Sequence, residues 1–232
     1  MKYEIDNKDI QDKEVSGWWN DDRTKKWHNF TYDKDNPLSH HLLLRQKKVL
    51  NYLKLLNLPK GSKVLELGGG AGQTAKKICE LGYDITGIDI SKHLCEESEK
   101  KCKKFVMEGT AKFINQSMEK KFPINDNEFD ACIIVGSIQY VGNLNYCFNE
   151  INRVLKNDGN LILCQANMYP LLDLIKPRHT ILKLSYFLLN EEFLISPSFK
   201  SILCESRIGK YFKKYENTTF MNLNFMTKGT DK

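Results

Sequence analysis

The strongest constraint on the fold is a glycine-rich turn that directly follows a short apolar run. Residues 63–67, KVLEL, have the length and composition of a buried strand, and Gly68-Gly69-Gly70-Ala71-Gly72 comes next. Glycine lets the backbone turn sharply and lets a ligand approach the main chain. Open α/β sheets bind ligands at such a turn, at the carboxyl end of a parallel strand. The sequence therefore predicts an α/β domain with a binding site at this turn.

The rest of the chain continues the same alternation. Apolar runs at residues 84–89, 131–136 and 160–165, and a weaker one at 112–115, predict further strands. Amphipathic stretches at 38–56, 71–81, 92–105 and 144–155 predict helices between and before them, with Ser91 as a cap. A last strand pair is expected around residues 210–225. This repeated β-α-β pattern is typical of a parallel sheet covered by helices on both faces.

Composition narrows the class of protein. The 232 residues suit one α/β domain, and no apolar stretch approaches the roughly 20 residues that span a bilayer. Seven irregularly spaced cysteines and a polar N-terminus without signal-peptide character favour free thiols in a reducing cytoplasm. The net charge of +6 comes without a basic, aromatic-interleaved run. We therefore expect a cytoplasmic protein with no membrane, nucleic-acid or metal partner.

Asp89 narrows the class of ligand that the glycine turn is expected to bind. It closes the second apolar run, about 20 residues after the turn, where an acidic side chain can accept hydrogen bonds from both ribose hydroxyls. The alternative is that Asp89 only caps the next helix. Gln73-Thr74 replaces the Lys-Ser or Lys-Thr pair of a phosphate loop, and Gln73 also fits the dinucleotide fingerprint poorly. The pattern favours a nucleoside ligand without a gripped phosphate.

Four segments together resemble the successive motifs of class I S-adenosylmethionine-dependent methyltransferases, in particular the small-molecule members. These segments are VLELGGGAG at 64–72, GIDIS at 87–91, FDACIIVGSIQYV at 129–141 and RVLKNDGNLIL at 153–163. The resemblance covers about half of the chain, and Asn157-Asp158-Gly159 replaces the family's usual Pro-Gly turn. It implies a Rossmann-like, doubly wound, mostly parallel seven-stranded sheet with helices on both faces. It also implies an N-terminal helical lid, so we expect a lid at 1–37 and the methyltransferase domain at 38–232, with core motifs at 63–165.

The resemblance also implies roles for individual residues around S-adenosylmethionine. The backbone of the turn would pass along the methionine part of the cofactor, and Asp89 would bind the ribose. The expected cofactor-binding residues are Tyr32, Arg45, Glu66, Gly68, Gly69, Gly70, Gly72, Asp89, Ile90, Ser117, Met118, Gly136 and Ser137. Glu66 would orient the ammonium group, while Ile90, Ser117 and Met118 would surround the adenine.

The acceptor side is less constrained. Methyl transfer from a sulfonium is an in-line displacement, so a general base is needed only when the acceptor holds its proton at neutral pH. His40, His41 and Tyr140 are the candidate catalytic residues, although a histidine at a helix start can equally be a solvated or capping residue. Arg45, one turn beyond His41, could hold the cofactor carboxylate or an anionic acceptor.

The sequence thus favours an enzyme that methylates an oxygen or nitrogen of a small, anionic or sugar- or nucleotide-linked metabolite, as a monomer or homodimer. Two alternatives remain open: a protein or RNA methyltransferase, and a non-catalytic module that binds S-adenosylmethionine. A third hypothesis, a nicotinamide dehydrogenase, is disfavoured because Gln73 fits the dinucleotide fingerprint poorly. The acceptor itself is not predicted.

Overall fold

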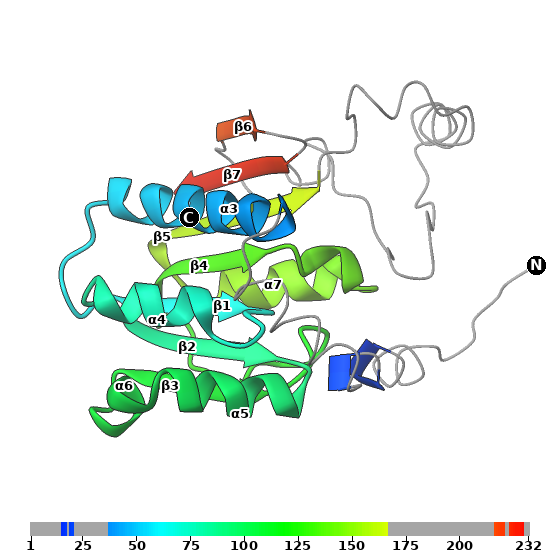
Figure 1. Cartoon of the computed structure of the whole chain (residues 1–232). Coiled ribbons are helices and arrows are strands. Elements are labelled where there is room, and N and C mark those ends of the chain that lie inside the picture. The colour runs from blue at the N-terminus through cyan, green and yellow to red at the C-terminus, as the bar shows by residue number, and fades with distance from the viewer. Residues whose placement is uncertain (1–14, 18, 21–36, 167–215, 221–222, 230–232) are drawn as a thin grey trace, which may run out of the picture.

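Figure 1 shows a computed structural model of the chain, which describes residues 15–17, 19, 20, 37–166, 216–220 and 223–229. Its helices are α3 (Pro37–Leu55), α4 (Gln73–Glu80), α5 (Lys92–Lys101), α6 (Lys103–Met107), α7 (Leu144–Val154) and the 3-10 turn η1 (Ile138–Tyr140). Its strands are β1 (Lys63–Leu67), β2 (Asp84–Asp89), β3 (Ala111–Asn115), β4 (Phe129–Val135), β5 (Leu155–Ala166), β6 (Glu216–Phe220) and β7 (Leu223–Gly229).

The strands form one sheet in the order β3-β2-β1-β4-β5-β7-β6. Strands β1 to β5 pair in parallel, whereas β7 pairs antiparallel with both β5 and β6. The chain order reverses between β1 and β4, because β2 and β3 lie on one side of β1 and the later strands on the other. The carboxyl ends of β1 and β4 therefore flank the position at which doubly wound sheets bind ligands.

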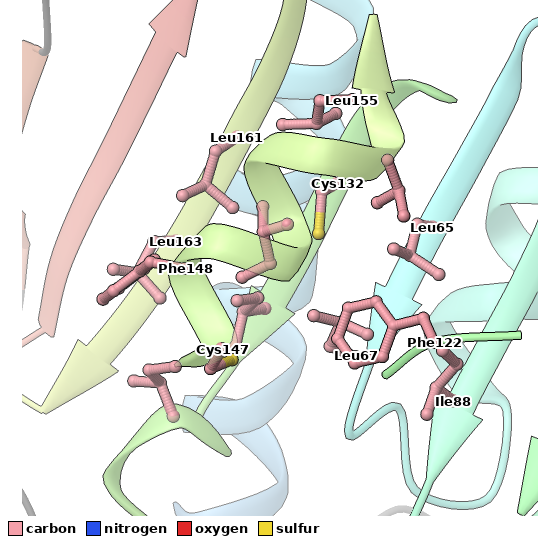
Figure 2. Close-up of a cluster of buried hydrophobic side chains, with 14 of the residues drawn as sticks. Leu65, Leu67, Ile88, Phe122, Cys132, Cys147, Phe148, Leu155, Leu161 and Leu163 are labelled. Atoms are coloured by element: carbon pink, nitrogen blue, oxygen red, sulfur yellow. The ribbon is translucent and has the colours of Figure 1, made fainter. Parts of the chain in front are cut away.

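Helices cover both faces of this sheet, as Figure 1 shows. On one face, side chains of α3 and α4 pack in a cluster with Val64 of β1 and Ile133 of β4. On the other face, α7 packs in a second cluster with Leu65 and Leu67 of β1 (Figure 2). Successive residues of β1 thus alternate between two cores, which fixes the register of the strand because a one-residue slip would exchange the faces.

Each fully buried large apolar side chain in these clusters stabilises the fold by about 1.5 to 3 kcal/mol. Phe122, Phe129 and Phe148 are the largest of them. Figure 2 shows side chains of the central strands and of α7 meeting around Cys132 and Cys147. All the cysteines among the described residues are buried free thiols.

The predicted doubly wound, mostly parallel sheet with helices on both faces is confirmed. Strands β1 and β2 have the predicted bounds, and Ser91 caps α5 by accepting the N–H of Leu94 at 3.3 Å. The predicted helix at 92–105 instead ends at Lys101, and α6 follows it. The predicted turn at 157–159 lies inside β5, because Leu155 pairs with Phe129 and Asn160 with Ala131, which leaves an irregularity between them.

Two further predictions concern the N-terminal lid and membrane-spanning segments. Most of the expected lid at 1–37 lies outside the described residues, so the domain boundary stays a prediction. None of the helices that the structure describes is long and apolar enough to cross a membrane.

Candidate functional site

The turn after β1 has a backbone that only glycine adopts easily. Gly68, Gly70 and Gly72 have φ values of 67°, 63° and 74°, a region that costs other residues roughly 1 to 2 kcal/mol. A Cβ on Gly68 would overlap the side chain of Ser137, and one on Gly72 would lie 2.9 Å from Ser98 Cα. The residue type at these positions is therefore imposed by both conformation and space.

Asp89 ends β2 beside this turn. Its Oδ2 accepts the Gly70 N–H at 3.0 Å, and its Oδ1 accepts the Ser91 N–H at 2.9 Å. Burial raises the pKa of the Asp89 carboxyl to about 6, while the two N–H donors lower it. The group is therefore ionised at neutral pH, and each oxygen keeps a lone pair for a further donor. Ser91, rather than Asp89, is the cap of α5.

Glu66 lies under the same turn. Its side chain is 2% exposed, and a Cβ on Gly69 would lie 2.6 Å from its carboxyl carbon. Burial, and then the negative charge of Asp89, raises the pKa of Glu66 to about 8. No residue in the described part of the chain donates a hydrogen bond to this carboxyl group. A cationic donor that entered here would favour the ionised form.

The end of β4 meets the end of β1 through Ser137. The hydroxyl of Ser137 donates to the Leu67 carbonyl at 2.9 Å. Gly136 has a φ of 68°, and Arg45 Nη1 from α3 lies 2.7 Å from the position of a Cβ on it. The structure thus brings Arg45 to the carboxyl end of β4, beside the residues predicted to face the methionine part of the cofactor.

Tyr140 closes the 3-10 turn that follows β4. Burial raises the pKa of its phenol, and a hydrogen bond from Gln139 and the positive charge of Arg45 partly oppose this rise. Tyr140 therefore holds its proton at neutral pH and acts as a hydrogen-bond donor more readily than as a base.

The predicted adenine residues are Ile90, directly after β2, and Ser117 and Met118 in the loop after β3. Met118 reaches the glycine turn, because its Cε lies 3.7 Å from a Cβ placed on Gly68, and Ser117 is buried nearby in the chain. Asn115, which pairs with Asp89 in the parallel ladder, donates to the carbonyls of Asp89 and Ile90 at 3.0 and 2.8 Å. This loop is thereby tied to the end of β2.

Sequence reasoning missed several residues that hold the site. Ser98 of α5 donates to the Gly70 carbonyl at 2.8 Å. Glu119 accepts the N–H groups of Gly142 and Asn143 at 2.7 and 3.2 Å, which ties the loop after β3 to the start of α7. A polar residue on the apolar stripe of Leu94 and Cys95 was a usable signal for Ser98. No comparable signal marks Glu119, whose partners are backbone groups distant in sequence.

Other predicted residues are not tested by the structure. Tyr32 lies outside the described residues. His40 and His41 belong to α3 by their backbone, but their side chains are not among those described. Within the described ranges, no group of three or more His, Cys, Asp or Glu side chains could hold a metal ion.

Comparisons with known proteins identify methyltransferases as similar to this chain. The sequence model of a family described as "Methyltransferase domain" matches residues 65–163, which run from β1 to β5. The chain is 31% identical over 112 residues to the demethylmenaquinone methyltransferase of Tropheryma whipplei, covering 48% of this chain and 45% of that protein. It is 25% identical over 171 residues to the ubiquinone biosynthesis O-methyltransferase of Pelagibacter ubique, covering 70% of this chain and 66% of the relative.

A solved structure shares the fold. The phospholethanolamine N-methyltransferase 2 of Haemonchus contortus, in complex with phosphomonomethylethanolamine and S-adenosylhomocysteine, matches with a TM-score of 0.60. The match has 15% identity and covers 80% of this chain and 53% of that one. The chain spans less than two thirds of the length of both curated relatives. The expected fold is confirmed, and the part of the chain from β1 to β5 matches a methyltransferase family.

Proposed function

Because residues 65–163 match a methyltransferase family, we propose that the chain is a class I S-adenosylmethionine-dependent methyltransferase and that the whole protein moves a methyl group to an oxygen or nitrogen of a small metabolite. The cofactor supplies an electrophilic methyl group on a sulfonium. The acceptor atom forms a bond to this methyl carbon while the carbon–sulfur bond breaks, and the acceptor then loses its proton. The protein has to align the two reactants and exclude water.

The observation that carries this proposal is the placement of Asp89. Its ionised carboxylate is fixed at the glycine turn by the N–H groups of Gly70 and Ser91, and both oxygens retain acceptor capacity. Two ribose hydroxyls would match these two oxygens. The methionine part would then follow the turn toward Gly136, and its ammonium group would meet the Glu66 carboxyl.

The acceptor would approach from the end of β4, where Arg45 and Tyr140 gather. A cation at this place favours an acceptor that carries or develops negative charge, such as an acidic hydroxyl. Tyr140 would orient that group by donating a hydrogen bond, and His40 or His41 would be the base if one is required. The names of both curated relatives, which refer to quinone compounds, also support a small-molecule acceptor.

Two other functions remain as alternatives: methylation of a protein or RNA, and cofactor binding without chemistry. One experiment separates both alternatives from the proposal. Purified protein is titrated with S-adenosylhomocysteine by calorimetry, and S-adenosylhomocysteine release from S-adenosylmethionine is then measured with phenols, carboxylate-bearing alcohols, amines, peptides and RNA. We expect turnover with one of the small molecules. Tight binding with no release on any acceptor would favour the binding module, and release only on peptide or RNA would reject the small-molecule proposal.

The variant Asp89→Ala tests the site itself. We expect it to weaken binding of S-adenosylhomocysteine by about 1 to 3 kcal/mol, which is the usual cost of removing a charged hydrogen-bond partner. Asp158→Ala, which changes an exposed carboxylate in β5, is the matched control and should bind as the wild type does. Unchanged affinity in a folded Asp89→Ala protein would refute the assignment of Asp89.

A further inference from the structure

A short N-terminal segment is anchored at the carboxyl end of β2. The residues 15–17, 19 and 20 are helical and lie beside this end of the sheet (Figure 1). Asn20 Oδ1 accepts the Ser91 hydroxyl at 2.9 Å and the His93 N–H at 3.3 Å. Ser91 is fully buried. The segment is therefore fixed to the structure two residues beyond Asp89, through a side chain that also caps α5.

The residue before Asn20 contacts a different part of the site. The Trp19 ring packs edge-on against Tyr140, with 5.6 Å between ring centroids and an angle of 83° between ring planes. Such a T-shaped pair contributes about 0.5 to 1.5 kcal/mol beyond the area that it buries. Adjacent residues thus contact the end of β2 and the turn after β4.

The strand order places the glycine turn between these two contacts. Strand β1 lies between β2 and β4 in the sheet, and the glycine turn begins where β1 ends. All three strands run parallel, so their carboxyl ends lie at the same edge. A two-residue segment that contacts the end of β2 and the turn after β4 must therefore pass across the end of β1.

Gln139 provides an independent indication of a ligand at this position. Its Nε2 donates to the Gly136 carbonyl at 2.7 Å. This contact fixes the orientation of the amide, because the flipped form would place Oε1 against the carbonyl oxygen of Gly136. Its Oε1 is buried and has no hydrogen-bond partner in the described part of the molecule. Native proteins rarely leave a buried acceptor unpaired. A donor on a bound molecule, next to the Trp19–Tyr140 contact, would satisfy it.

We propose that Trp19 is a further binding residue, which covers the bound cofactor above the glycine turn, and that Asn20 is the positioning residue that holds Trp19 there. The inference rests on the proposed function. Because Trp19 crosses the end of β1, the cofactor product leaves only after the Trp19–Tyr140 contact opens. The strength of the Asn20 anchor on Ser91 and His93 therefore controls the rate of product dissociation.

The test measures the dissociation rate of S-adenosylhomocysteine by rapid mixing with excess competitor. Asn20→Ala removes the acceptor of two hydrogen bonds, and we expect dissociation about 10-fold faster. Asn20→Asp keeps an acceptor oxygen at the N-terminus of α5, where negative charge is favourable, but loses the amide that donates to the Ser16 carbonyl at 2.8 Å, so we expect a rate between those of the wild type and Asn20→Ala. Trp19→Leu keeps an apolar side chain without the ring and should match Asn20→Ala.

A control and a stability measurement make the outcome decisive. Asn160→Ala, in an exposed part of β5, should leave the rate unchanged, and the thermal midpoint of every variant shows that it is folded. Wild-type dissociation rates in folded Asn20→Ala and Trp19→Leu proteins would overturn the inference and leave the proposed function intact. Absence of any S-adenosylhomocysteine binding by the wild type would instead reject the proposed function.

Discussion

At the scale of single residues, Glu66 is the most unusual group in the molecule. It is a carboxyl group with a pKa of about 8, because it is buried and lies near Asp89. Between about pH 4.5 and 8 the folded protein holds this proton while the unfolded chain has lost it. The unfolded chain then binds fewer protons, so the free energy of unfolding falls as the pH rises through this window. Glu66 thus lowers the stability of the ligand-free protein.

The variant Glu66→Gln tests both the destabilisation by the buried carboxyl group and its proposed role in binding the ammonium group of the cofactor. In the wild type, Glu66 should make the free energy of unfolding fall with pH by up to about 1.4 kcal/mol per pH unit between about pH 5 and 8. We expect urea unfolding of the variant to lack this contribution. The ligand-free variant should be more stable than the wild type at pH 8. Calorimetry should also show weaker binding of S-adenosylhomocysteine, because the ammonium group loses its anionic partner. Equal pH profiles would contradict the buried, protonated state of Glu66.

Gly68 permits a second prediction with a matched control. Gly68→Ala and Gly109→Ala both place a Cβ on a residue with positive φ, but only the first meets the side chain of Ser137. We expect Gly109→Ala to cost roughly 1 to 2 kcal/mol from backbone strain alone. Gly68→Ala should cost more and should weaken S-adenosylhomocysteine binding as well. Similar unfolding free energies for both variants would show that the contact with Ser137 relaxes easily.

At the scale of elements, Arg153 fastens the loop between β3 and β4 to α7. Its guanidinium donates to Glu150 at 2.7 and 2.9 Å, to Asp126, and to the carbonyls of Phe122 and Ile124. Glu150 also accepts the Phe122 N–H at 2.8 Å. This network holds Phe122 in the core and raises the pKa of Arg153. Arg153 and Glu150 thereby position the part of this loop that contains Phe122 and Ile124.

Arg153→Lys should therefore destabilise the protein although it keeps the charge. An ammonium group cannot reproduce the planar set of donors, and the loss of several charged hydrogen bonds should cost about 1 to 3 kcal/mol in urea unfolding. Lys77→Met breaks an exposed ion pair with Glu80 and should change stability by less than about 1 kcal/mol. A cost for Arg153→Lys as small as that of Lys77→Met would contradict a positioning role for the network.

The helices, strands and loops also differ in how far the sequence predicted them. Residues 63–67 and 84–89 were predicted with the observed bounds, because each is a short segment with apolar residues that ends at the glycine turn or at Asp89. The irregularity at residues 156–159 and the loop held by Arg153 were not predicted, because neither has a hydrophobic period and both depend on contacts distant in sequence. The proximity of Asp89 to the glycine turn could be predicted for the opposite reason, since both features follow strands whose pattern is local in the sequence.

At the scale of the whole molecule, the site joins parts of the chain that only the folded sheet brings together. The glycine turn, Asp89, Met118 and Ser137 belong to four successive β-α units, so ligand binding should stabilise the entire sheet. S-adenosylhomocysteine at 100 times its dissociation constant should raise the free energy of unfolding by about 2.7 kcal/mol. A thermal shift that is absent in the wild type, or unchanged in Asp89→Ala at the same concentration, would contradict this linkage. No sequence pattern foretold that Trp19 would reach Tyr140.

Alkylation of the buried thiols can report how often the layers around them open. Burial raises the pKa of Cys102 to about 11 and that of Cys79 and Cys164 to about 12, so the reactive thiolate is scarce and shielded in the native state. Alkylation by iodoacetamide at any of them then requires the surrounding layer to separate first. Mass spectrometry of the labelled peptides would rank α4, α5 and the central strands by how often each detaches, without any introduced probe.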